Sequence, residues 1–127
     1  MNDFYYRKLD VYQLAKQLAI EVYRLQRKFP DYEKYSLCDQ IRRAAISVPS
    51  NIAEGAGRIA VKERIRFLDI ANGSLSETIC QLEISKDLNY ISEEDFANIE
   101  ALASRVSMTL LGLKKSLLEK INKQQQS

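Results

Sequence analysis

The sequence contains no histidine, only two cysteines, four glycines and two prolines. Without histidine, the Glu-x-x-His pairs that hold di-iron centres in helical bundles cannot form. There is no glycine-rich phosphate loop, and no serine or cysteine stands beside a plausible base. Cys38 and Cys80 lack any metal-ligand spacing, which favours two reduced thiols over a disulfide between them. The sequence therefore predicts a protein that is not an enzyme and holds no cofactor or metal.

Long apolar runs are missing as well. Residues 1–7 contain none, which predicts that there is no signal peptide. No run elsewhere approaches the roughly 20 residues that span a membrane, so we expect a cytoplasmic protein. The chain has 127 residues and is expected to form a single domain over residues 1–127.

Hydrophobic residues make up 46% of the chain, and in four segments they recur every three to four positions, the spacing of one helical face. Pro30 is expected to end the first segment, and Ser92 is expected to cap the fourth. The predicted helices cover about 10–29, 37–55, 61–88 and 92–121. Four helices with short connections predict an all-α, antiparallel up-down-up-down four-helix bundle.

Residues 40–58 combine an apolar seam with many alanines, serines and glycines. Such small side chains let another backbone approach closely, so this helix is expected to be surrounded by others. Pro49 removes a backbone donor and is expected to bend it. Gly55 and Gly57 are interpreted as left-handed residues at its end. Gly73 costs about 1 kcal/mol relative to alanine in a helix, so a close helix contact is expected there too.

A second apolar stripe lies away from the seam on three of the helices, at 100° of rotation per residue. A monomeric four-helix bundle has no second core for these side chains. Scattered surface exposure is the alternative, but stripes on three helices favour a buried oligomer interface. Its predicted residues are Tyr12, Tyr23, Phe67, Ile70, Leu111 and Leu118.

Charge is unevenly distributed along the chain. Residues 7–28 and 40–66 each carry six basic and two acidic residues, whereas residues 67–100 carry one basic and eight acidic residues. Separated zones of this kind can present a basic face to a polyanion or pair with a second copy. The alternative is ordinary solvated helix faces.

Five basic residues flank the predicted connection between the second and third helices, and arginine is the preferred partner of phosphate. These residues form a candidate nucleic-acid-binding site: Arg42, Arg43, Arg58, Lys62 and Arg66. The alternative is that Arg42 and Arg43 form structural pairs with carboxylates such as Glu54 or Glu63. No aromatic stacking platform or nucleic-acid motif accompanies them, so recognition would be of backbone or shape.

Three stretches carry a family resemblance. Residues 40–55 read QIRRAAISVPSNIAEG and are followed by Gly57 and Arg58, residues 66–77 read RFLDIANGSLSE, and residues 9–15 read LDVYQLA. They resemble the bacterial four-helix-bundle proteins encoded in intervening sequences of 23S ribosomal RNA genes. The relatives of that family include the accessory variability determinant of diversity-generating retroelements, a pentameric barrel that binds a reverse transcriptase and nucleic acid.

The resemblance implies a cyclic homo-oligomer, with five subunits favoured. It places the basic residues of the family at Arg42, Arg43, Arg58 and Arg66, and its other motif positions at Asn51, Glu54, Gly55 and Gly73. Asn72 departs from the pattern, because many relatives carry a basic residue there. The resemblance and the residues together predict a non-enzymatic, oligomeric, RNA-associated accessory protein. The alternative is a self-assembling adaptor that docks another protein without binding nucleic acid.

Overall fold

The computed structural model describes residues 4–126 and confirms the all-α prediction, with four α-helices and no strand in that range. Two short 3-10 helices precede α1 and α2. The elements are η1 (Tyr5–Lys8), α1 (Asp10–Gln26), η2 (Asp31–Glu33), α2 (Leu37–Ala56), α3 (Val61–Asp87) and α4 (Glu93–Gln126). None of these helices is long and apolar enough to cross a membrane.

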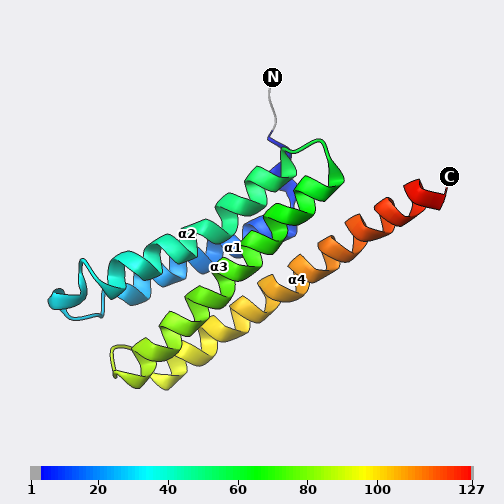
Figure 1. The fold of residues 1–127 in the computed structure, drawn as a ribbon. Coiled ribbons are helices and arrows are strands. Elements are labelled where there is room, and N and C mark those ends of the chain that lie inside the picture. Colours follow the sequence, from blue (N-terminus) through cyan, green and yellow to red (C-terminus); the bar gives the residue numbers. More distant parts are fainter. Residues whose placement is uncertain (1–3, 127) are drawn as a thin grey trace.

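Each long helix packs against two others. Figure 1 shows α1 beside α2 and α3 beside α4, and contacts between α2 and α3 and between α1 and α4 join the two pairs. The core forms where the four apolar seams meet, because burial of apolar surface is the main favourable term in folding. Its most deeply buried large side chains are Leu18, Ile41, Ile52, Leu82, Val11, Val22, Val48 and Val106.

The helix ends differ in part from the sequence prediction. Helix α1 ends at Gln26 and not at residue 29, although Phe29 is still buried and packs against Tyr90 with ring centroids 5.3 Å apart. Helix α4 continues past residue 121 to Gln126. Phe29 therefore joins the core from a turn that follows α1. Helical periodicity alone does not show that this residue lies outside the helix.

The interpretation of Gly55 and Gly57 as left-handed residues is wrong. Gly55 lies inside α2, and Gly57 follows the helix with φ of −85°. Within residues 4–126, Asn89 has the positive φ, 63°, at the connection between α3 and α4. Asparagine tolerates this conformation better than most residues. The left-handed residue is therefore an asparagine after α3, whereas glycines at the end of α2 were expected to be left-handed.

Gly73 does not mark a close helix contact, contrary to the sequence prediction. A methyl group added there would meet no other atom within 4 Å, whereas one added at Gly55 would lie 2.9 Å from Cβ of Phe67. The close approach of α2 and α3 therefore occurs at Gly55. It holds α3 against α2 at the end where the two helices are connected.

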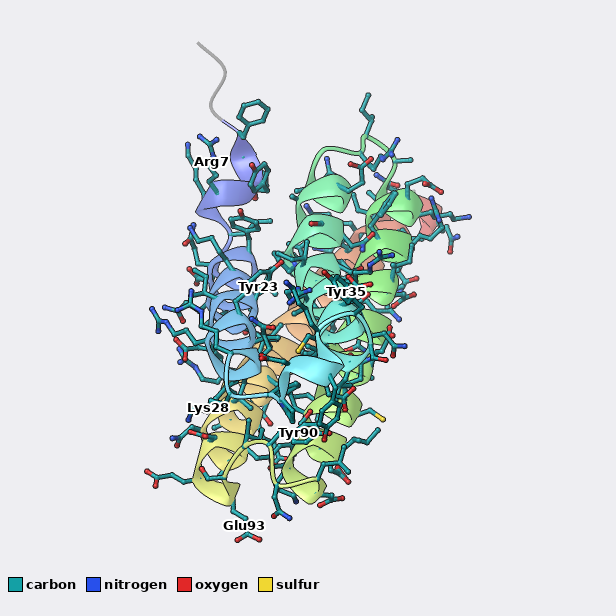
Figure 2. The ribbon with its side chains drawn as sticks, turned by 90° about the vertical axis from the view of Figure 1, so that its left-hand side faces the viewer. Arg7, Tyr23, Lys28, Tyr35, Tyr90 and Glu93 are labelled. Carbon is teal, nitrogen blue, oxygen red and sulfur yellow. The ribbon has the colours of Figure 1, made fainter. Side chains whose placement is uncertain are left out.

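The predicted cap of α4 is confirmed. The Asp95 amide donates to Ser92 Oγ at 2.9 Å, and the Ser92 amide donates back to Asp95 Oδ2 at 3.4 Å. This reciprocal pair is a capping box. Lys28, labelled in Figure 2, donates to the same carboxylate at 2.8 Å. That hydrogen bond is the largest cause of the lowered pKa of Asp95.

Candidate nucleic-acid interface

The α2–α3 basic surface consists of Arg58, Lys62, Arg64 and Arg66, on the connection between the helices and the first turns of α3. Three of them belong to the predicted site. Arg64, which was not predicted as a site residue, is half-buried, and its Nε donates to the Arg58 carbonyl at 2.6 Å. The signal available in the sequence was proximity alone, since Arg64 lies between Lys62 and Arg66. The connection is therefore held by a basic side chain from the first turn of α3.

Phe67 organises this surface. It is only 9% exposed, lies over Gly55, and has the Arg58 and Arg66 guanidinium carbons 5.0 and 4.7 Å from its ring centroid. Cations within about 6 Å of a ring face are attracted by its quadrupole. The prediction that Phe67 lies outside the packing of its own bundle is therefore wrong. Its ring positions two arginines.

The same two arginines also pair with carboxylates close to them in the sequence. Arg58 pairs with Glu54, and Arg66 Nη2 lies 3.2 Å from Glu63 Oε2. All four side chains are roughly half exposed, and pairs of this kind contribute at most about 1 kcal/mol. Ion pairing with Glu54 and Glu63, considered above for Arg42 and Arg43, is thus found for other arginines.

Arg42 and Arg43 lie apart from the α2–α3 basic surface, near the start of α2. Arg42 Nη1 donates to Gln26 Oε1 at 2.9 Å, and Arg43 Nε lies 3.3 Å from Asp39 Oδ2. Fifteen residues separate Arg43 from Arg58, which is about 22 Å at the helical rise. The expectation that all five predicted basic residues flank one connection is therefore wrong, because α2 carries two of them at its other end.

Asn51 makes packing contacts next to the contact between α2 and α3. Its Nδ2 donates to the Ser47 carbonyl and to Ser47 Oγ, both at 2.8 Å, and Ser47 Oγ lies 2.7 Å from Ser74 Oγ. These small polar side chains join α2 to α3. Of the motif positions suggested by the resemblance, Asn51 and Gly55 serve the contact between these helices, and Glu54 pairs with Arg58.

A groove of about 720 Å³ runs between α1 and α2 and was not predicted from the sequence. Figure 2 shows Tyr23 between these two helices. Three tyrosines, three cations and six small or apolar residues line what we call the α1–α2 groove: Tyr6, Tyr12, Tyr23, Lys16, Arg24, Arg27, Ala19, Ile20, Ile46, Pro49, Ser50 and Ala53. Lys16 follows Tyr12, and Arg27 follows Tyr23, by one helical turn each. This repeated spacing of a tyrosine and a cation is visible in the sequence and could have indicated the groove.

The remaining members of the predicted oligomer interface are exposed on the single chain. Ile70 on α3 is 39% exposed, and Leu111 and Leu118 on α4 are 58% and 42% exposed. Asp69, beside Ile70, accepts a hydrogen bond from Lys114 at 2.7 Å. An apolar strip thus borders an ion pair that joins α3 to α4.

The described residues show no arrangement suited to metal binding. No three of their cysteine and carboxylate side chains are grouped so that they could hold an ion. Both cysteines are free, Cys38 in the core and Cys80 on the surface, and burial raises the pKa of the Cys38 thiol.

At the end of the bundle, Tyr90 donates to Glu33 at 2.8 Å and lies 3.0 Å from the Tyr32 hydroxyl. Hydrogen bonds to these two groups raise the pKa of Tyr90.

Comparisons with known proteins agree with this architecture. A solved structure from Bacteroides thetaiotaomicron, described as a protein of unknown function from the S23 ribosomal protein family, superposes with a TM-score of 0.76 at 24% identity. The match covers 83% of this chain and 98% of that one, and at this identity it shows the fold. No curated protein matches the sequence. The model of the family described as 23S rRNA-intervening sequence protein matches residues 7–112. The chain therefore belongs to the 23S rRNA-intervening sequence protein family.

Proposed function

We propose that this protein is a non-enzymatic, RNA-associated protein of the cytoplasm that holds RNA backbone on the α2–α3 basic surface. The observation that carries the proposal is the placement of Arg58 and Arg66 over the ring of Phe67. Guanidinium groups held in this way have lost much of their rotamer freedom before a ligand arrives. A phosphate can then accept two parallel N–H hydrogen bonds from either of them.

The carboxylates paired with these arginines do not oppose such binding strongly. Because the pairs with Glu54 and Glu63 are exposed, exchanging a carboxylate for a phosphate costs little. Lys62, exposed on the first turn of α3, adds a further cation. Binding through these groups is expected to tolerate changes of RNA sequence and to weaken with salt, because it releases counterions from the phosphates.

We also propose that the antiparallel bundle assembles into a closed ring, with five subunits favoured. The exposed Ile70, Leu111 and Leu118 support an apolar contact between copies. A ring would repeat the α2–α3 basic surface once per subunit, so that each further RNA contact becomes intramolecular. A surface too weak to retain RNA in one copy would then retain it in the assembly.

The second candidate function is an adaptor that assembles with itself and docks another protein. The paired state of Arg58 and Arg66 favours it, because satisfied ion pairs need no ligand. In that case the exposed apolar side chains of α3 and α4 would serve protein contacts alone.

RNA titration of charge variants separates the two functions. We expect Arg58→Gln combined with Arg66→Gln to weaken binding of a labelled RNA hairpin at least tenfold, measured by fluorescence anisotropy. Arg105→Gln combined with Lys115→Gln removes two exposed cations of α4 instead and should leave the affinity within about threefold of wild type. Equal affinities for wild type and the first variant, or no binding by wild type at low salt, would favour the adaptor.

A further inference from the structure

We propose that the α1–α2 groove binds an unpaired RNA strand, with bases stacked on its tyrosines and phosphates held by Lys16, Arg24 and Arg27. This inference rests on the proposed function, because it names the form of RNA that the protein would take. It adds a second surface to the α2–α3 basic surface. Along the chain, Ala53 of the groove precedes Arg58 by five residues.

The charge of the lining points to an anionic occupant. Three of its twelve residues are cations and none is a carboxylate. Glu21 pairs with Arg24 from the preceding turn but does not line the groove. Arg43 shares its face of α2 with Ile46 and Ser50 by helical spacing, but it pairs with Asp39 and does not line the groove.

The rings of the groove suit nucleobases. Tyr12 meets Tyr6 edge to face, with centroids 4.7 Å apart, and Lys16 Nζ lies 5.8 Å from the centroid of Tyr12. Tyr23 is 39% exposed and stands eleven residues further along α1, about 16 Å away at the helical rise. Rings spaced along a cationic groove are how proteins bind single strands without sequence preference, since every base can stack.

Small residues of α2 leave room for such a strand. Ser50 is exposed and Ala53 is half-buried, with Pro49 beneath them. Larger side chains at these positions would fill the space between α1 and α2. Part of the small-residue pattern of residues 40–58 therefore shapes a binding surface and does not serve helix packing.

A second copy of the chain fits the α1–α2 groove less well. Its best charge match would be the acidic face of α3 and α4, where Glu83 and Glu100 line a hollow of about 460 Å³. That face is itself concave, and two hollows cannot fill one another. A flexible strand that carries one charge per nucleotide meets both the shape and the charge of the α1–α2 groove.

Replacement of the rings tests stacking directly. Tyr12→Leu combined with Tyr23→Leu keeps apolar surface in the groove but removes two stacking faces. We expect this variant to lose at least about tenfold in affinity for a labelled oligouridylate of about ten nucleotides. Binding of an RNA duplex of the same length should be unchanged, because paired bases are not free to stack. Tyr12→Phe combined with Tyr23→Phe is the matched control and should bind both RNAs as wild type does.

A spectroscopic probe makes the test independent of affinity. The chain contains no tryptophan, so Tyr23→Trp introduces a single indole into the groove. Its fluorescence should be quenched by oligouridylate and not by the duplex.

Three results would overturn the inference. The first is that the leucine variant binds oligouridylate with the affinity of wild type. The second is that the tryptophan fluorescence does not change when oligouridylate is added. The third is a lower mass of the leucine variant in light scattering, which would assign the groove to a second copy. In each case, loss of hairpin binding on Arg58→Gln with Arg66→Gln would leave the proposed function standing. Failure of wild type to bind either RNA would remove both.

Discussion

At the scale of single residues, Gly55 and Gly73 show how much a sequence pattern leaves open. Both lie inside long helices among alanines and serines, but Gly73 was predicted to mark a close helix contact, whereas Gly55 was interpreted as a left-handed residue at a helix end. In the structure Gly55 faces Phe67 and the Arg64 carbonyl, whereas Gly73 faces open space. The difference depends on how α3 is rotated against α2, and no local pattern records that rotation.

Alanine substitutions at these two glycines are expected to act in opposite directions. At Gly55 the new methyl group would lie 2.9 Å from Cβ of Phe67 and 3.3 Å from the Arg64 carbonyl oxygen, and overpacking of this kind costs about 1–3 kcal/mol. At Gly73 the change should add about 1 kcal/mol of helix stability. Urea denaturation of both variants measures the difference. Equal midpoints for Gly55→Ala and Gly73→Ala would contradict the close contact between α2 and α3.

At the scale of elements, helix starts were more predictable than helix ends. The cap of α4 depends on Ser92 and Asp95, which are three residues apart, so the sequence contains the whole interaction. The end of α1 depends in part on Phe29 reaching Tyr90 from a turn, a contact between distant segments. Local chemistry predicted the first, whereas the second combines the local effect of Pro30 with tertiary packing.

The Asp95 carboxylate is expected to make stability depend on pH. Its pKa is lowered from 3.8 in the folded chain, so its contribution is complete above the unfolded value and disappears as pH falls through the folded value. We expect Asp95→Asn to reduce the free energy of unfolding by about 1 kcal/mol at pH 7. The deficit should shrink below pH 3.8.

Denaturation at neutral and acidic pH measures this effect. Glu119→Gln, on the exposed surface of α4, is the control and should follow wild type at both pH values. A deficit for Asp95→Asn that is the same at both pH values would show that the ionised carboxylate does not stabilise the fold.

At the scale of the whole molecule, the sequence predicted the four helices and most of the core, because buried seams impose a regular spacing. It did not predict which outer residues lie together. Phe67 was placed on an outer stripe, yet its ring packs over Gly55 beneath two arginines. Lys16, Arg24 and Arg27 were counted as charge but not as a site, because the α1–α2 groove exists only once both helices are in place.

The assembly of several copies is a prediction at the same scale. Leu111 and Ile70 are exposed on the single chain, and in a ring they would be buried between copies. Size exclusion with light scattering should therefore report an oligomer for wild type and a smaller species for Leu111→Asp. Ile59→Asp, at an exposed residue of the α2–α3 connection, is the control and should keep the wild-type mass. A wild-type monomer at micromolar concentration would contradict the ring.

Salt dependence of RNA binding tests the central claim most directly, because it counts the phosphates that the protein neutralises. The observed affinity of wild type for the labelled RNA hairpin should fall linearly on a log–log plot against salt concentration. Replacement of Arg58 and Arg66 by glutamine should reduce the slope by about 1.8, or about 0.9 for each lost phosphate contact. An unchanged slope, or affinity that does not respond to salt, would contradict binding of RNA backbone by the α2–α3 basic surface.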